Sequence, residues 1–280
     1  MVVGSVNLDL VVVTPRLPRA HEKLRVGTWA AEDGGAGGNT ASWLAYLGRD
    51  VELVSVVGND AIGKHLLATL RHGGVETRWI RSVETASAIA ISLSTGKEKR
   101  ILALSGPSPD TAILAYPRDH FDPLTHLHLV GEITPESRAL VEDAKARGSS
   151  ISVEGNGYDP SPILELVDLC MMNSDELREI DNSRHRTDEA RARALISEHP
   201  GWLVVTQGAS GAIAVSRETV ERISTIQIDP IDRTGAGDAF DAAFLDSWTR
   251  NRRVETALSE GLELAAEVLQ QIGSRPRPRS

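Results

Sequence analysis

Short apolar stretches alternate with longer amphipathic ones along most of the chain. Val51–Val57 is almost continuously apolar, which is typical of a strand buried on both faces. Asn39–Leu47 has apolar residues three and four positions apart, which predicts a helix with Gly48 at its end. From residue 126 onward strand-like and helix-like segments alternate, so we expect βαβ units. The segments expected there are His126–Val130, Pro135–Arg147, Ile151–Glu154, Val167–Met172, Thr187–Glu198 and Trp202–Thr206.

This pattern predicts an α/β fold with a doubly wound, mainly parallel sheet and helices on both faces. Two pairs of strand-like segments interrupt the alternation. Leu10–Val13 and Leu24–Ala31 flank a proline-rich turn, and Ala86–Ser94 is followed by Arg100–Leu104.

Length and composition indicate an ordinary globular protein. The 280 residues are 41% hydrophobic and 25% charged, enough for a substantial core. No apolar run reaches the roughly 18 residues of a membrane span, and strand-like Val2-Val3 at the start leaves no room for a signal peptide. The single cysteine, Cys170, lies in an apolar run and is interpreted as a small buried hydrophobe. One cysteine fits a reducing compartment, so a cytoplasmic location is expected.

The net charge of −9 argues against a general nucleic-acid-binding protein. The one basic cluster is the tail from Arg275 to Ser280, where prolines prevent a helix, and we predict that it is disordered or loosely packed. An acidic protein that binds a phosphorylated nucleotide needs local compensation. Glycine-turn N–H groups and a divalent cation can provide it.

The most informative stretch is Asp232–Asp238, which reads Asp-Arg-Thr-Gly-Ala-Gly-Asp. It follows the strand-like Val220–Ile228 and precedes a run of helical spacing from Ala239. Glycines let the backbone approach a ligand, and a helix N-terminus binds anions through its unpaired N–H groups. Asp238 beside such a site either removes a proton from a hydroxyl during phosphoryl transfer or simply caps the helix.

Polar residues also follow the first predicted strand, Met1–Gly4. Asn7 and Asp9 lie on the side of the sheet where ligands bind in open α/β folds, although such residues also favour turns. Asn39 either caps its helix or contacts the substrate.

Three other patterns resemble motifs that bind phosphate, a dinucleotide or a metal ion. The stretch from Gly58 to His65 misses the P-loop pattern, because His65 stands where Ser or Thr should bind magnesium. Neither glycine turn completes the dinucleotide fingerprint, which weakens an oxidoreductase interpretation. His126 and His128 share one strand face, but without an evident third ligand they are predicted to be structural.

Two glycine-rich motifs carry a family resemblance. Asp-x-x-Gly-Ala-Gly-Asp before an alanine-rich helix resembles the C-terminal signature of the ribokinase-like (PfkB-type) carbohydrate kinases. Gly34-Gly35-Ala36-Gly37-Gly38-Asn39, running into a helix that ends in Leu-Gly, is similar to the family's N-terminal signature. The resemblance covers nearly the whole chain. It implies a single ribokinase-like domain over residues 1–280, with lid strands inserted at about 10–32 and 85–104.

The resemblance implies an ATP-dependent transfer of a phosphoryl group to a hydroxyl of a small sugar. Asp238 would be the base, and the N–H groups of Gly235, Ala236 and Gly237 the anion hole. The residues implied for the acceptor are Asn7, Asp9, Gly35, Asn39 and Glu132. Those implied for the nucleotide are Asn173, Thr206, Gly208, Gly211, Thr234 and Gly237. Asn173 and Glu176 would organise Mg²⁺ and its waters, although the same pair could form a helix cap.

The resemblance leaves several points open. It allows a monovalent cation such as K⁺, whose ligands the sequence does not place, and a homodimer formed through the lid. Ala36 stands where ribokinases usually carry a lysine, which favours a neutral sugar other than ribose. A nucleoside kinase of the same fold is the first alternative, but Trp29 is the only aromatic residue in the predicted lid segments. A sugar or nucleotide sensor without catalysis is the second, and a base beside the anion hole speaks against it.

Overall fold

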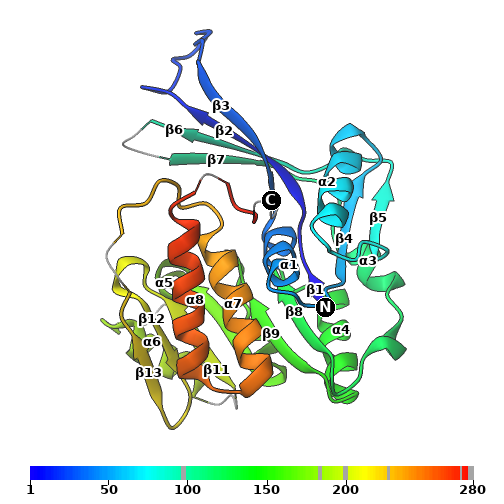
Figure 1. Ribbon diagram of the computed structural model, residues 1–280, viewed down its shortest axis with the longest axis vertical. Coiled ribbons are helices and arrows are strands. Elements are labelled where there is room, and N and C mark those ends of the chain that lie inside the picture. Colours follow the sequence, from blue (N-terminus) through cyan, green and yellow to red (C-terminus); the bar gives the residue numbers. More distant parts are fainter. Residues whose placement is uncertain (96–98, 182–184, 198–200, 226–227, 272, 277–280) are drawn as a thin grey trace.

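The computed structural model describes residues 1–280 except 96–98, 182–184, 198–200, 226–227, 272 and 277–280. In the described part, a large sheet carries helices on both faces and a small sheet projects beyond it (Figure 1). This is the doubly wound α/β fold with an additional small sheet that the sequence predicted.

The large sheet is mainly parallel. Its order is β13-β12-β11-β10-β9-β8-β1-β4-β5, and β12 alone runs antiparallel to its neighbours in the described part. The chain leaves β1 toward β4 on one side and later builds outward from β8 on the other. Ligands bind beyond the carboxyl ends of strands where the order reverses in this way. The strands are β1 (Val2–Val3), β4 (Leu53–Gly58), β5 (Ile80–Val83), β8 (His126–Val130), β9 (Ser150–Glu154), β10 (Leu169–Asn173), β11 (Trp202–Thr206), β12 (Ala212–Val215) and β13 (Val220–Ile223).

Helices bury both faces of this sheet. One face packs against α3 (Asp110–Ala115), α4 (Pro135–Ala146), α5 (Ser174–Ile180) and α6 (Asp188–Ile196). The other packs against α1 (Ala36–Tyr46), α2 (Ala61–His72), α7 (Ala236–Asn251) and α8 (Val254–Val268). The 3₁₀ helices are η1 (Arg118–His120), η2 (Ser161–Leu166) and η3 (Gly208–Ser210).

Strand β10 shows why the sheet is covered on both sides. Cys170 and Met172 point into the core cluster on one face, whereas Leu169 and Met171 point into the cluster on the other. Successive side chains of a strand alternate between faces, so a fully apolar strand needs two layers of helices. Cys170 is a free, buried thiol, as predicted, and burial raises its pKa.

The small sheet has the order β3-β2-β6-β7. Strand β2 (Asn7–Val13) pairs antiparallel with β3 (Thr28–Gly34) and parallel with β6 (Ile89–Ser94), and β7 (Lys99–Leu104) completes the edge. We call this four-stranded sheet the lid. Its position over the carboxyl ends of the large sheet is seen in Figure 1.

Strand β2 begins earlier than the sequence predicted and β3 ends later, whereas β3 and β6 begin later than predicted. Asn7 pairs with Gly34 at the start of the ladder between β2 and β3, so these residues belong to a strand rather than a turn. The pattern Asn-Leu-Asp-Leu alternates polar and apolar side chains, which a strand with one exposed face accommodates. The polar pair Glu32-Asp33 similarly stays within β3, because Leu8 and Asp9 of β2 lie opposite.

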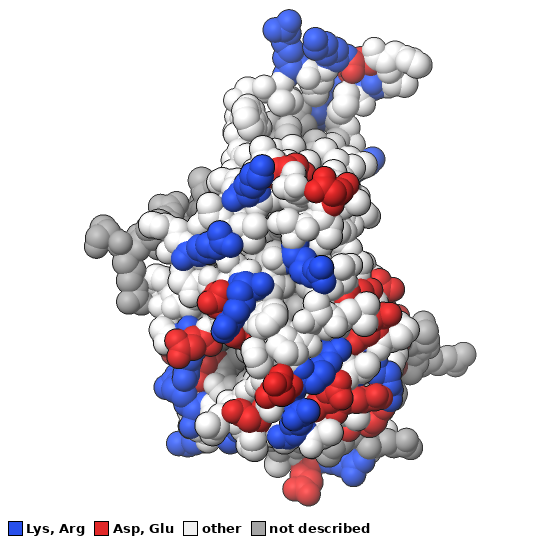
Figure 2. Space-filling model, turned by 90° about the vertical axis from the view of Figure 1, so that its right-hand side faces the viewer, with Lys and Arg blue, Asp and Glu red and all other residues white. Residues whose placement is uncertain are grey.

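The face of the molecule shown in Figure 2 has no large patch of a single charge sign. On the face shown in Figure 2, basic and acidic side chains are interspersed over the body, and much of the projecting lid between its tip and the body is uncharged. Among the described helices, none combines the length and the apolar character that a bilayer crossing demands.

Candidate active site

The two glycine motifs meet where the N-termini of α1 and α7 lie together. Asn39 of α1 donates through Nδ2 to Oδ2 of Asp238 on α7, at 2.7 Å, across 199 positions of sequence. The helices pack through a shared cluster that includes Trp43 and Ala242. Asn39 is not an N-cap: α1 begins at Ala36 after Gly35, so Asn39 lies within the helix and its side chain reaches across to α7.

Asp238 does not cap its helix either. The N-cap of α7 is Gly235, which has no side chain to offer, and Asp238 is the third helical residue. Burial raises the pKa of Asp238 to about 6, and the charge of Asp9 adds to this, while the hydrogen bond from Asn39 and the charge of Arg275 act in the opposite direction. A carboxylate with a pKa near neutrality is well matched to accept a proton at physiological pH.

The start of α7 is open to an anion. Gly235 has φ +79°, and no side-chain hydrogen bond caps the first turn. A Cβ added at Gly237 would meet nothing within 4 Å, so there is free space beside the N–H groups. Uncapped N–H groups together with the positive end of the helix dipole bind anions such as phosphate.

A cavity of about 240 Å³ adjoins this helix start. It brings together four residues predicted to contact a nucleotide, and Phe240 and Leu262 give it an apolar wall. Thr234 does not line it, because its N–H and Oγ1 donate to Oδ1 of Asp232 and hold the turn instead. The four predicted residues are Thr206, Gly208, Gly211 and Gly237.

The residues predicted for the acceptor lie mostly around Asp238. Asn7 donates through Nδ2 to Oδ1 of Asp9 at 2.6 Å. A Cβ at Gly34 would come within 2.3 Å of Oδ2 of Asp9, so a side chain there would displace this carboxylate. Gly35, with φ +90°, makes the turn into α1. Glu132 stands apart: it follows β8 as an exposed residue, and no contact with Asn39 or Asp238 is seen in the described part.

Asn173 and Glu176 form a capping box at the start of α5. Oδ1 of Asn173 accepts from the N–H groups of Asp175 and Glu176, and Oε2 of Glu176 accepts from the N–H of Asn173. The helix-cap interpretation is therefore realised in the structure. The pair still ends β10 at the carboxyl edge, and the charge of Glu176 contributes to raising the pKa values of Glu154 and Asp241 near Asp238.

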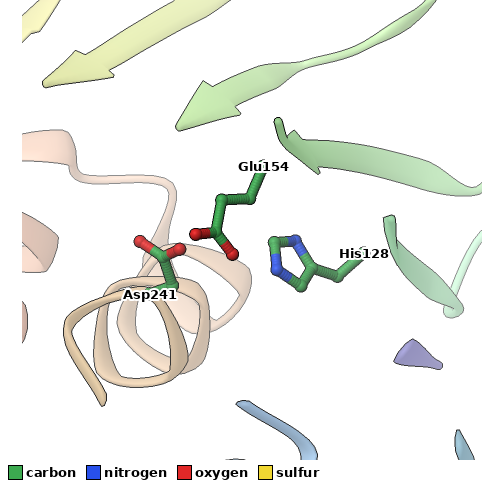
Figure 3. A group of neighbouring side chains, drawn as sticks. All are labelled: His128, Glu154 and Asp241. Carbon is green, nitrogen blue, oxygen red and sulfur yellow. The ribbon is translucent and has the colours of Figure 1, made fainter. Parts of the chain in front are cut away.

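A buried cluster behind Asp238 was not foreseen. His128 of β8, Glu154 of β9 and Asp241 of α7 converge, with one donor atom from each within 4.8 Å of the others (Figure 3). Burial lowers the pKa of His128 to about 3, so its ring is neutral, and Nδ1 contacts Oγ of Ser152. The sequence showed no third ligand near His126 and His128, because both carboxyl groups come from elements distant in sequence.

Burial raises the pKa values of both Glu154 and Asp241, and the charge of Asp238 raises them further. A hydrogen bond joins the two carboxyl groups. Two acids this close retain a proton between them, since both cannot ionise side by side. The donor set of one imidazole and two carboxyl groups could also hold a divalent cation.

The segment after α8 lies in the same site, contrary to the prediction of a loose tail. Arg275 is largely buried: it forms an ion pair with Asp33 at 3.2 Å, and its Nη2 donates to the Gly34 carbonyl at 2.9 Å. Ser274 receives the indole N–H of Trp43 on its carbonyl. Proline prevents a helix here but not a packed extended segment. The remainder of the predicted tail, residues 277–280, lies outside the described residues.

The stretch from Gly58 to His65, which nearly matches the P-loop pattern, forms the end of β4 and the capped start of α2. Asp60 accepts hydrogen bonds from the N–H groups of Gly63 and Ser87 and from Oγ of Ser87. The carboxylate of Asp60 therefore already caps the N-terminus of this helix. His65 lies further along α2 and contacts Asp33.

Comparison with known proteins decides the family. The model of the pfkB family carbohydrate kinases matches residues 1–279. The chain belongs to this family of carbohydrate kinases. Curated relatives in it include the ribokinase of Lactococcus lactis subsp. lactis (strain IL1403), which is 26% identical over 98% of this chain and 91% of its own. Another is the guanosine-inosine kinase of Exiguobacterium acetylicum, 25% identical over 96% of this chain and 93% of its own.

Solved structures agree on the fold of this pfkB-family chain. Arabidopsis thaliana ribokinase complexed with ribose and ATP aligns with a TM-score of 0.84 at 23% identity, covering 98% of this chain and 94% of its own. The adenosine kinase of Sinorhizobium meliloti aligns with the same TM-score at 19% identity, covering 98% and 94%. At such identities the likeness shows the ribokinase-like fold alone, and sugar and nucleoside kinases share it.

Proposed function

We propose that this pfkB-family protein transfers the γ-phosphoryl group of ATP to a hydroxyl of a small sugar. The contact between Asn39 and Asp238 carries the proposal. It holds a carboxylate with a raised pKa beside an open helix N-terminus, between the cavity below and the lid above. A base on the acceptor and an electrostatic clamp on the transferring group are the main requirements of in-line phosphoryl transfer.

In the proposed reaction, Asp238 accepts the proton of the acceptor hydroxyl as its oxygen attacks the γ-phosphorus. The bond from that phosphorus to the bridging oxygen of ADP breaks, and ADP leaves with the electron pair. The N–H groups at the start of α7, from Ala236 onward, face the charge that builds on the phosphoryl oxygens. Such preorganised donors stabilise a transition state because they need not reorient during the reaction.

We propose that the cavity of about 240 Å³ holds the nucleotide base, with Thr206, Gly208 and Gly211 on one side and Gly237 at the phosphate end. Mg²⁺ would neutralise the phosphates when bound. Asn173 and Glu176 supply the hard oxygen donors that suit such an ion through its waters, and the capping box fixes their orientation. No ligands are proposed for K⁺.

A sugar suits the acceptor side better than a nucleoside. Asn7, Asp9 and Asn39 offer donors and acceptors for adjacent hydroxyl groups, whereas Trp29 of the lid is 64% exposed. Buried polar groups that lose their partners cost about 1–3 kcal/mol each, so this site should reject acceptors without those hydroxyls. Glu132 remains a proposed acceptor contact, although it lies apart from Asn7, Asp9 and Asn39 and would reach the acceptor from another side.

One assay tests the proposal. ADP release is measured over furanoses, ketohexoses, sugar acids and nucleosides with ATP and Mg²⁺. We expect the highest kcat/KM for a sugar. A nucleoside as best acceptor would move the protein to the nucleoside kinases, and ligand binding without any ADP release would make it a sensor.

We further propose that the protein forms a homodimer through the lid. Large apolar side chains are exposed on one face of its strands: Trp29 is 64% exposed, Leu102 53% and Leu104 49%. A contiguous exposed apolar surface marks an interaction site. Sedimentation equilibrium should give a dimer mass, and a monomer at micromolar concentration would contradict the proposal.

A further inference from the structure

The chain after α8 returns to the acceptor side of the site. In Figure 1 it turns back beneath the lid, in red, toward α1. Gly235 packs directly against Ser274, since a Cβ there would lie 2.5 Å from its Cα. Oγ of Ser274 donates to the carbonyl of Asp33 at 3.0 Å. The segment therefore contacts the anion-binding turn on one side and the end of β3 on the other.

Arg275 fixes the orientation of the Asn39 amide. Oδ1 of Asn39 lies 3.2 Å from both Nε of Arg275 and Oγ of Ser274. A guanidinium has only donors, so the group that faces it must be the amide oxygen. Nδ2 is then left to donate to Asp238, as observed. A flipped amide would present its oxygen to the carboxylate and its N–H groups to the cation.

The guanidinium also places a positive charge among three carboxylates. Its direct partner is Asp33, and the charges of Asp9 and Asp238 act on it as well. These groups come from β2, β3 and α7, while Glu154 and Asp241 lie behind Asp238. Three negatively charged side chains beside one positively charged side chain favour a neutral acceptor over a negatively charged sugar acid. Ala36 provides no cation where ribokinases usually carry a lysine, whereas Arg275 brings one from the other end of the chain.

We propose that Arg275 is an acceptor-recognition and positioning residue of this kinase, which holds the Asn39 amide toward Asp238 and offers its remaining N–H groups to an acceptor hydroxyl. This rests on the proposed function. The guanidinium of Arg275 donates one hydrogen bond each to Asn39, Asp33 and the Gly34 carbonyl. A guanidinium has five N–H donors, so the contacts among the described residues leave two for a ligand.

The test compares Arg275→Met, Arg275→Lys and the wild type. Arg253→Met serves as the matched control, because Arg253 is exposed at the N-cap of α8, beyond the end of α7 opposite to Asp238. Two quantities are measured: KM for the best acceptor and for ATP, and the pKa of Asp238 by carboxyl carbon NMR without substrates. The NMR signal is assigned by its loss in Asp238→Asn.

Arg275→Met should raise acceptor KM by ~10-fold or more, the range for a lost hydrogen bond to a charged group. ATP KM should stay unchanged. The pKa of Asp238 should rise, since a positive charge that lowers it is gone. Arg275→Lys should keep this pKa close to the wild-type value but still raise acceptor KM, because an ammonium lacks the fork. A merely structural arginine would move neither quantity.

The inference is overturned if Arg275→Met leaves both quantities at the values of Arg253→Met. Failure of the proposed function appears differently, as a wild type that phosphorylates no sugar. The NMR titration still decides the positioning role in that case, because it needs no turnover. If Arg275→Met does not fold, Arg275→Lys alone must show the rise in acceptor KM, and an unchanged KM rejects the proposal.

Discussion

Replacing Asp238 by Asn should lower the activity of this protein and raise its stability. The amide keeps the shape of the side chain but cannot accept the acceptor proton, so kcat should fall by ~10²–10⁴. Binding of ATP and sugar should change little. Stability should rise because burial holds the pKa of Asp238 at about 6, above its usual 3.8. A buried carboxylate is a cost that a catalytic site tolerates and the amide avoids.

The pH dependence and size follow from these two values. Well below pH 3.8 the carboxyl group is protonated in both folded and unfolded chains. Between pH 3.8 and about 6 the unfolded chain releases the proton while the folded protein keeps it, so the free energy of unfolding falls as pH rises. Above pH 6 the loss is complete. The difference between 3.8 and about 6 corresponds to about 3 kcal/mol, an upper value since Asp238 is partly exposed.

Urea unfolding at pH 4 and pH 8 measures the effect. The free energy of unfolding of Asp238→Asn should exceed that of the wild type by about 1–3 kcal/mol at pH 8, and the two should be nearly equal at pH 4. The control is Asp50→Asn, which changes an exposed aspartate and should show no such pH dependence. A variant that is less stable at pH 8, or that differs equally at both pH values, would refute the reasoning. Near-normal turnover would remove Asp238 from the mechanism.

Three further changes probe the rest of the site. Asn39→Ala should raise the KM for the sugar and leave the KM for ATP unchanged, because its amide faces the base and the acceptor side; steady-state kinetics checks this, and a rise in the KM for ATP alone would contradict it. Glu176→Gln should raise the Mg²⁺ concentration needed for half-maximal activity, and an unchanged magnesium titration would leave the pair as a helix cap. Asp241→Asn should raise the melting temperature at pH 8 more than at pH 5, because it removes one acid of the buried pair whose pKa values are raised. Thermal unfolding at the two pH values measures this. A larger increase at pH 5 would show that the acid pair does not destabilise the protein at high pH.

The sequence predicted the parts of this protein that depend on local pattern. Alternation of strands and helices gave the doubly wound sheet, and the glycine motifs marked the starts of α1 and α7. Asn7 and Asp9 were predicted to contact the ligand, with a turn as the alternative, and cross-strand pairing with β3 places them in β2. Tertiary pairing overrides a local preference for a turn when the ladder can continue.

What the sequence could not show depends on contacts between distant segments. The prolines around Arg275 indicate only that no helix forms there, and its burial follows from Asp33 and Asn39, more than 230 positions away. The cluster of His128, Glu154 and Asp241 likewise needs three elements to converge. A histidine two residues from another on one strand carries no sign of its carboxyl neighbours.

The continuous pairing of β2 with β3 down to Asn7 and Gly34 has a consequence for how the site opens. The connection from β3 to α1 is the single residue Gly35, so on this side the lid cannot move without bending its own strands or shifting the start of α1. Asp9 and Asp33 lie on the lid strands, whereas Asp238 stays with the body. An opening of the lid would therefore carry Asp9 and Asp33 away from Asp238. Under the proposed function, release of the phosphorylated product and separation of the acceptor contacts from Asp238 would then be a single motion.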